Sequence, residues 1–271
     1  SRFSLDQGLK SGRYKLSLRL RTIFSDGTDS TLRNIAAGRC VKVDSLPPLG
    51  RPQFVEVDSF SISEDRVKRY LPHGRSGRLD AIVGELRSRL EELIQPRALF
   101  VFRKHYELDA SDLSLPKPVN SCSRMALAVA TIGKQIEEES DRLRGKGEIS
   151  RGFLLDSLGA AAVTKLACMT GGEIAKRVSE AGLGTTRAFS PGSGSSKWGI
   201  LNQQLIFDNL DASRIGVELT SSSTMIPKKS ISFVLGVGSN YENRRPEELF
   251  SCRGCPRTNC DYRGLAERSS N

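Results

Sequence analysis

Apolar and polar side chains alternate with a period of two over residues 14–24. This alternation predicts a β-strand, and the turn signal Asp26-Gly27 that follows it predicts a hairpin. The proline-rich run over residues 46–52 then predicts a stiff connector. We therefore expect residues 1–54 to form a basic N-terminal extension that precedes the main domain.

Downstream of this connector, the spacing of apolar residues predicts a series of helices and strands. Strands are expected over residues 55–62, 98–102, 125–132, 215–220 and 230–237, and helices over residues 79–94, 134–143, 151–178 and 201–210. Gly171 and Gly172 are expected to interrupt or kink the alanine-rich helix 151–178. Because these elements mix without a regular βαβ alternation, the predicted fold class is α+β, with the main domain over residues 55–245.

The composition is that of a folded globular protein, since hydrophobic residues make up 38% and charged residues 27% of the 271 positions. No apolar run reaches the roughly 18 residues that a membrane span needs, and no signal-peptide core begins the chain. Together with three isolated cysteines, this predicts a protein of the reducing cytoplasm with no membrane partner. An organelle-targeting origin of the Arg- and Ser-rich start is the alternative.

The net charge of +10 suits an anionic partner, such as an acidic protein or a phosphorylated small molecule. Lysines and arginines are spread along the whole chain rather than gathered in blocks, and aromatic residues make up only 6% of it. Nucleic acid is therefore not the expected partner, although a basic RNA-binding protein with a zinc knuckle is an alternative.

The strongest chemical signal lies near the C-terminus, where Cys252, Cys255 and Cys260 have the spacing C-x2-C-x4-C. Thiolates at this spacing can bind one metal ion or cluster, so the tail over residues 246–271 is predicted to be a metal-binding segment. An iron–sulfur cluster, a structural zinc ion and no metal are the three alternatives. No cysteine or histidine follows Cys260, so a fourth ligand would come from elsewhere in the fold, with Cys122 as one candidate, from a carboxylate such as the adjacent Asp261, or from an external molecule.

A second candidate site is the glycine- and serine-rich loop that runs from Arg187 to Trp198. Its glycines permit positive φ angles and a close approach of the backbone to a ligand, and its hydroxyl and N–H groups can bind an oxyanion or a carboxylate. A surface loop without a ligand is the alternative interpretation. No catalytic triad and no paired carboxylates stand out in the sequence, so no catalytic residue is assigned and enzymatic activity stays open.

This loop belongs to an ordered succession of short motifs. In chain order the succession comprises Arg69-Tyr-Leu, Thr131-Ile-Gly, Leu155-Asp-Ser-Leu-Gly-Ala-Ala, Phe189-Ser-Pro-Gly, Trp198, Gln203-Gln-Leu-Ile-Phe, Ile215-Gly-Val-Glu-Leu-Thr and Met225-Ile-Pro-Lys-Lys-Ser-Ile-Ser-Phe-Val-Leu-Gly. Closed by the cysteine triplet and Tyr262-Arg263, it resembles the activation domain of cobalamin-dependent methionine synthase, and the short free-standing members of that family in particular. The resemblance covers residues 55–265.

The resemblance implies a curved, mostly antiparallel sheet with flanking helices, and a shallow groove on the sheet that binds S-adenosylmethionine. It implies an accessory role in reactivation of, or methyl transfer to, a corrinoid-binding protein or methyltransferase, with an external electron donor. An iron–sulfur cluster at the three cysteines would deliver the electron. The predicted ligand-binding residues are Arg187, Pro191, Gly192 and Ser193. The residues predicted to face an acidic partner are Lys228 and Lys229.

The chain departs from the family pattern within the loop. The family has Arg-x-Ser-Pro-Gly-Tyr, whereas here Ser193 stands at the tyrosine position, Ala188 stands at the arginine position, and Arg187 comes one residue earlier. The alternative function is therefore a non-catalytic docking subunit of a larger complex that has lost S-adenosylmethionine binding.

Overall fold

The computed structural model describes residues 49–250, apart from residues 58–59, 64–65, 68–69, 71–76, 109–114 and 195–197. Within these residues the main sheet has five strands, all paired antiparallel, in the order β1-β2-β3-β7-β4. The strands are β1 (Gln53–Phe54), β2 (Arg97–Lys104), β3 (Arg124–Thr131), β7 (Ser230–Gly238) and β4 (Gly184–Thr185). The long central strands β2, β3 and β7 contain most of the residues of the sheet.

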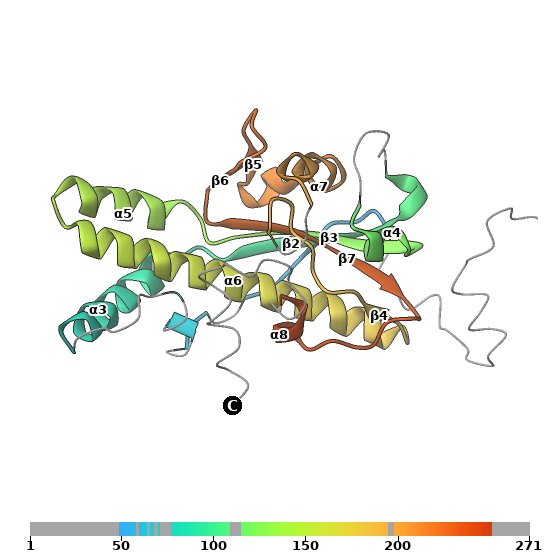
Figure 1. Cartoon of the computed structure of the whole chain (residues 1–271), viewed down its shortest axis with the longest axis horizontal. Helices are drawn as coiled ribbons and strands as arrows, with labels where there is room; N and C mark the ends of the chain where they lie inside the picture. Colours follow the sequence, from blue (N-terminus) through green and yellow to red (C-terminus); the bar gives the residue numbers. More distant parts are fainter. Residues whose placement is uncertain are drawn as a thin grey trace, which may run out of the picture.

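Both faces of the sheet are covered (Figure 1). The helix α6 (Ile149–Glu180) crosses one face, and α7 (Gln203–Asn209) lies on the other. Side chains along β3 alternate between these two sides: Ala126 and Ala128 belong to the α6 side of the core, and Met125, Leu127 and Val129 to the α7 side. Because both faces are buried, the strands are almost continuously apolar.

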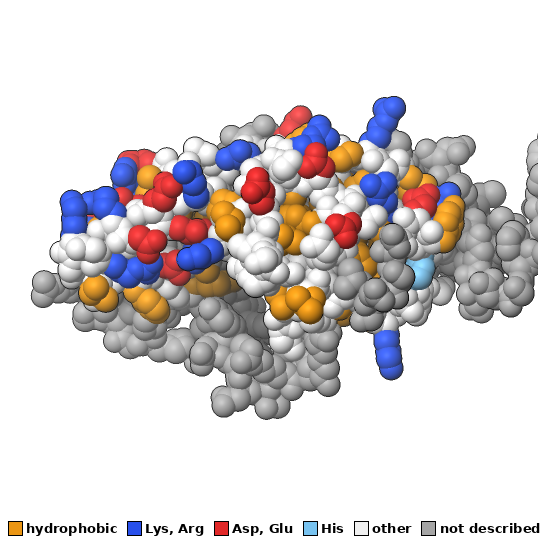
Figure 2. Space-filling model, turned by 90° about the horizontal axis from the view of Figure 1, so that it is seen from above, with side chains coloured by type: hydrophobic (Ala, Val, Ile, Leu, Met, Phe, Trp, Pro, Cys, Tyr) orange, Lys and Arg blue, Asp and Glu red, His pale blue; other side chains and the backbone are white. Residues whose placement is uncertain are grey.

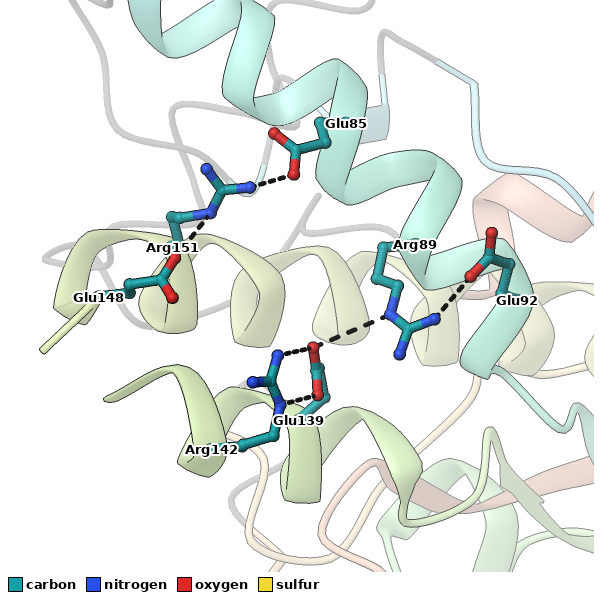
Figure 3. A network of polar contacts seen from close by, with 7 residues as sticks. All are labelled: Glu85, Arg89, Glu92, Glu139, Arg142, Glu148 and Arg151. Carbon is teal, nitrogen blue, oxygen red and sulfur yellow. Dashed lines mark hydrogen bonds and ion pairs between the residues drawn. The ribbon is translucent and has the colours of Figure 1, made fainter. Parts of the chain in front are cut away.

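Three helices form a layer that extends past one end of the sheet (Figure 1). They are α3 (Gly77–Leu93), α5 (Gln135–Gly145) and α6, of which α5 and α6 make a tight antiparallel hairpin. A Cβ atom at Gly152 of α6 would lie 2.7 Å from the carbonyl oxygen of Ser140 in α5, so the glycine permits this close approach. Charged side chains join the three helices along their exposed surfaces (Figure 3).

The remaining elements are short and surround the sheet. They are η2 (His105–Glu107), α4 (Lys117–Asn120), η3 (Ile200–Asn202), η4 (Ala212–Ile215), β5 (Glu218–Leu219), β6 (Met225–Ile226) and α8 (Pro246–Leu249). β5 and β6 pair with each other as a separate two-stranded sheet. This hairpin rises beside α7, on the side of the main sheet opposite α6 (Figure 1).

The predicted α+β class, with an antiparallel sheet and flanking helices, is confirmed. The predicted strand over residues 55–62 is wrong, because the strand pairing is at Gln53–Phe54 and the described residues of 55–62 lie outside the strands. The apolar positions that suggested this strand, Val55 and Val57, pack instead against the core between α3 and α6. The predicted strand over residues 14–24 and the hairpin turn at Asp26-Gly27 lie outside the described residues.

Two further predictions need correction. Of the strand expected over residues 215–220, only Glu218–Leu219 pairs, because Ile215 ends the 3-10 helix η4 and Gly216 turns the chain with φ +73°. Gly171 and Gly172 do not interrupt α6, which runs unbroken for 32 residues.

α6 is also long and apolar enough to cross a membrane by length and composition. In its most apolar 18-residue window, however, 61% of the residues are buried inside the protein. Core helices of globular proteins pass the same test, so this helix is weak evidence for a membrane span.

Candidate functional site

The candidate loop begins where the chain leaves β4 and crosses to β7. Phe189 forms a β-bridge with Val234, with N–O distances of 3.0 and 2.9 Å, which fixes this part of the loop to the sheet. Ala188, one residue earlier, packs on the α6 side of the core, whereas Phe189 packs on the α7 side. The Arg187 guanidinium lies 4.9 Å from the centre of the Phe189 ring, so Arg187 reaches the same side as Phe189.

Positions 187 and 188 therefore face opposite sides of the sheet. An arginine at position 188 would point into the α6 side of the core, where Ala188 packs and where its N–H donates to the Leu249 carbonyl (2.9 Å). At position 187 the guanidinium instead lies over the Phe189 ring. An arginine at position 187 therefore lies on the α7 side of the sheet, whereas a side chain at position 188 lies on the α6 side.

The next four residues form a β-turn. The Ser193 N–H donates to the Ser190 carbonyl at 3.2 Å, and Gly192 has φ +74°. Proline followed by a positive-φ glycine at the two central positions is the signature of a type II turn. The positive φ of Gly192 favours glycine, and a Cβ atom there would also lie 2.7 Å from Ile200 Cδ1, the end of an exposed side chain.

Trp198 connects the end of the loop to the turn and to the core. Its carbonyl oxygen accepts a hydrogen bond from the Gly192 N–H at 2.7 Å, and its side chain is buried in the core on the α7 side. The turn is therefore tied directly to a buried aromatic residue. Position 193 at the end of the turn is a serine, so the turn itself contains no aromatic side chain.

A buried glutamine fastens the helix behind the loop to the sheet. Gln203, at the start of α7, donates through Nε2 to the Ser223 carbonyl (3.0 Å) and accepts through Oε1 from Ser232 Oγ (2.9 Å). It thereby joins α7, β7 and the turn between β5 and β6, in which Ser223 has φ +57°. Sequence reasoning assigned no role to Gln203. The signal that could have identified it is a polar residue at a core-facing position of the predicted helix, where an apolar residue is usual.

The structure brings Arg187, Pro191, Gly192 and Ser193 into one short segment, held to β7 by Phe189 and to Trp198 by Gly192. Two of them have defined structural tasks: Pro191 and Gly192 make the turn. Their binding of a ligand remains a prediction.

Lys229 does not lie on a rim that faces a partner. Its ammonium pairs with Asp156 of α6 at 2.9 Å, its side chain is only 14% exposed, and its backbone N–H donates to Glu137 Oε1 at 2.8 Å. It joins the start of β7 to α5 and α6. Lys228 is exposed.

Cys122 is a buried thiol beside the site. Its Sγ donates to the Pro118 carbonyl, which also accepts from the Tyr241 hydroxyl at 3.0 Å. Burial raises the pKa of the Cys122 thiol, and the hydrogen bond with Tyr241 offsets this only in part. The role of Cys122 as a fourth ligand stays a prediction, because the three tail cysteines lie outside the described residues.

Cys252, Cys255 and Cys260 lie outside the described residues. Within residues that are described, no group of three or more histidine, cysteine, aspartate or glutamate side chains could hold a metal ion.

Among the solved structures that are similar to this chain is the MetH reactivation domain. The match is to the crystal structure of that domain bound to AdoHcy, with 11% sequence identity and a TM-score of 0.45, over 74% of this chain and 83% of that chain. No protein-family profile matches the sequence, and no curated protein is significantly similar to it.

Proposed function

We propose that the protein is an accessory protein of the methionine synthase activation-domain type, in which residues 187–193 bind S-adenosylmethionine and present it to a corrinoid-binding protein or methyltransferase. One observation carries the proposal. The motif that resembles the family's ligand loop folds as a type II turn anchored to the sheet, with Arg187 on the Phe189 side.

In this proposal Arg187 binds the carboxylate of the methionine moiety. A guanidinium can make two parallel hydrogen bonds to a carboxylate, and such charge-assisted bonds are the stronger kind. Ser193 offers a hydroxyl where the family has an aromatic ring, so the adenine or ribose would lose a stacking partner. We therefore expect weak binding that depends strongly on Arg187.

Trp198 provides the test. It is the single tryptophan of the chain, it is buried, and its carbonyl is bonded to Gly192 in the turn. Titration of the full-length protein with S-adenosylmethionine should change tryptophan fluorescence saturably. Loss of charged hydrogen bonds costs about 1.5–3 kcal/mol, so Arg187→Ala should weaken binding by about tenfold or more.

Two variants control this experiment. Arg187→Lys keeps the charge but loses the bidentate geometry, so it should bind with intermediate affinity. Arg87→Ala, on the exposed surface of α3, removes an arginine with an ordinary surface ion pair and should bind like the wild type. The proposal would be abandoned if millimolar S-adenosylmethionine gave neither a fluorescence change nor calorimetric heat.

The three tail cysteines are the residues that would hold the metal centre. Three thiolates at C-x2-C-x4-C spacing suit both an iron–sulfur cluster and zinc, and no described side-chain cluster competes with them. A bound cluster would supply single electrons, accepted from an external donor, whereas zinc would only hold the tail in place. Broad visible absorption after anaerobic purification supports the cluster, and a colourless protein with one zinc excludes electron delivery by this site.

A docking subunit without S-adenosylmethionine is the second candidate function. Ile200 and Leu201 of η3 are exposed apolar residues next to the turn, and Leu201 is 64% exposed. Apolar residues beside a loop that lacks the family's tyrosine suit contact with a protein. Absence of ligand binding, together with co-purification of a partner that Leu201→Ser releases, would favour this function.

A further inference from the structure

One extra residue interrupts the strand pairing where β4 leads into the candidate loop. The two residue pairs that flank the interruption are Thr185–Val237 and Phe189–Val234. Between them lie residues 186–188 on the loop side but only residues 235–236 on β7. An extra residue on one strand of an antiparallel pair is a β-bulge, and bulges beside functional sites change the direction of a side chain.

The bulge determines which side of the sheet Arg187 faces. Val237 packs on the α6 side, so its direct partner Thr185 lies on that side too. Strict alternation from Thr185 would put positions 187 and 189 on the α6 side as well. Phe189 instead packs on the α7 side, with the Arg187 guanidinium 4.9 Å from the centre of its ring. The extra residue thus moves Arg187 and Phe189 to the opposite face.

Thr186 makes hydrogen bonds to both strands across the bulge. Its backbone N–H donates to the Gly236 carbonyl at 2.9 Å, as in regular pairing. The return bond from the Gly236 N–H goes to Thr186 Oγ1 at 2.9 Å, where regular pairing would use the Thr186 carbonyl. The same hydroxyl donates to the Arg187 carbonyl at 2.8 Å. A single side chain therefore replaces the backbone contact that the bulge interrupts.

This hydroxyl lies in a closely packed place. Thr186 is only 2% exposed. A Cβ atom at Gly236 would lie 3.0 Å from Thr186 Cγ2 and 2.6 Å from Cys122 Sγ, so glycine at position 236 lets the threonine pack directly on β7. With so little exposure to water, the Gly236 N–H depends on the Thr186 hydroxyl for its hydrogen bond.

We propose that Thr186 is a positioning residue, whose hydroxyl holds the β-bulge and thereby keeps Arg187 on the α7 side of the sheet. The ligand part of this inference rests on the proposed function, in which Arg187 binds the carboxylate of S-adenosylmethionine. The geometric part is independent of any ligand. Because Thr186 acts on the ligand only through Arg187, loss of its hydroxyl and loss of the guanidinium remove the same contact.

A matched set of variants of the full-length protein tests this role. Thr186→Val keeps the β-branched shape and removes the hydroxyl, whereas Thr186→Ser keeps the hydroxyl. Thr170→Val is the control, since Thr170 is fully buried and its hydroxyl bonds within α6, to the Leu166 carbonyl at 2.9 Å. The control thus removes a buried hydroxyl that makes no bond to the loop.

NMR detects the position of Arg187 without a ligand. In the wild type, a nuclear Overhauser contact should join the Arg187 side chain to the Phe189 ring protons. Thr186→Val should lose this contact, whereas Thr186→Ser and Thr170→Val should keep it. The proposal is overturned if the contact is absent from the wild type or from Thr186→Ser, or if it persists in Thr186→Val. If Thr186→Val does not fold, the spectra of the wild type and Thr186→Ser decide.

Ligand affinity tests whether Thr186 acts through Arg187. Thr186→Val should weaken S-adenosylmethionine binding by about tenfold or more, as Arg187→Ala should, because both lose the same charge-assisted bonds. The double variant should bind no more weakly than Arg187→Ala alone. Methylthioadenosine lacks the carboxylate, so Thr186→Val should leave its affinity unchanged.

The affinity results separate this inference from the proposed function. Unchanged S-adenosylmethionine binding in Thr186→Val, equal losses for both ligands, or a double variant weaker than Arg187→Ala would each overturn a role of Thr186 through Arg187. If the NMR contacts behave as expected but the wild type binds no S-adenosylmethionine, the positioning of Arg187 by Thr186 stands. The ligand assignment of the proposed function then fails.

Discussion

At the scale of single residues, the glycines inside helices have different environments that the sequence does not distinguish. Gly84 in α3 has open space around it, whereas Gly152 in α6 faces the Ser140 carbonyl of α5. Gly84→Ala should stabilise the protein by about 0.5–1 kcal/mol, because alanine loses less backbone entropy in a helix. Gly152→Ala should destabilise it by about 1–3 kcal/mol, because its Cβ forces two backbones apart. Urea unfolding of both variants measures this, and equal shifts would contradict the close packing of α5 on α6.

Gln203 gives a second prediction at this scale. Gln203→Ala leaves the Ser223 carbonyl and Ser232 hydroxyl without their partner, and an unsatisfied buried polar group costs about 1–3 kcal/mol. Adding Ser232→Ala should cost less in the Gln203→Ala background than in the wild type, because the hydroxyl is then no longer bonded. A double-mutant cycle by urea unfolding measures this difference. Strictly additive effects would mean that the two side chains do not interact.

At the scale of elements, an ion-pair network joins α3 and α5, while Arg151 of α6 pairs with Glu85 and Glu148 (Figure 3). Its most enclosed carboxylate is Glu139, 12% exposed, which accepts two hydrogen bonds from Arg142 at 2.6 and 2.7 Å. Arg89 of α3 approaches the same carboxylate at 3.8 Å. The network therefore reaches across the helix layer as well as along each helix.

These contacts predict a pH dependence. The hydrogen bonds from Arg142, followed by the charges of Arg142 and Arg89, lower the pKa of Glu139 in the folded state. A lowered folded-state pKa means that the carboxylate stabilises the fold above the unfolded value near 4.3, and that this contribution is lost as the pH falls through the lower folded value. Glu139→Gln should lower the urea midpoint near neutral pH and flatten its decline below about pH 5. Parallel curves for variant and wild type would contradict this role.

Element length decides how much of the fold the sequence predicts. α5, α6, β3 and β7 have enough repeats of the apolar pattern to be located within a few residues. The strands β1, β4, β5 and β6 have two residues each, and such segments contain no periodicity. Each forms because an adjacent strand provides backbone N–H and C=O groups for pairing, as β2 does at Leu99 and Phe100 for β1. The same holds for the candidate site. The turn can be predicted from the local sequence Pro191-Gly192, whereas the position of α8 and the role of Gln203 depend on contacts with residues far away in the sequence.

At the scale of the whole molecule, the positive charge is concentrated toward the ends of the chain. Residues 1–48 contain nine Lys and Arg against four Asp and Glu, and residues 251–271 contain four against two. The remaining residues therefore hold +3 of the net +10. On the face in Figure 2, acidic and basic side chains of the described residues are interspersed, so the described part of this face shows no continuous basic patch of the kind that binds nucleic acid.

The sheet is the central layer between α6 and α7, and substitutions on its two faces should therefore have different effects. Ala128 and Leu127 are neighbours on β3, both fully buried, but they face opposite helical layers. Ala128→Leu inserts a large side chain between the sheet and α6, which should cost about 1–3 kcal/mol. Leu127→Ala leaves a cavity under α7 and should cost about 2–5 kcal/mol. Urea unfolding of both variants tests whether the sheet is the central layer. A loss under about 0.5 kcal/mol for Leu127→Ala, the range of ordinary surface substitutions, would mean that α7 does not seal the face on which the candidate loop lies.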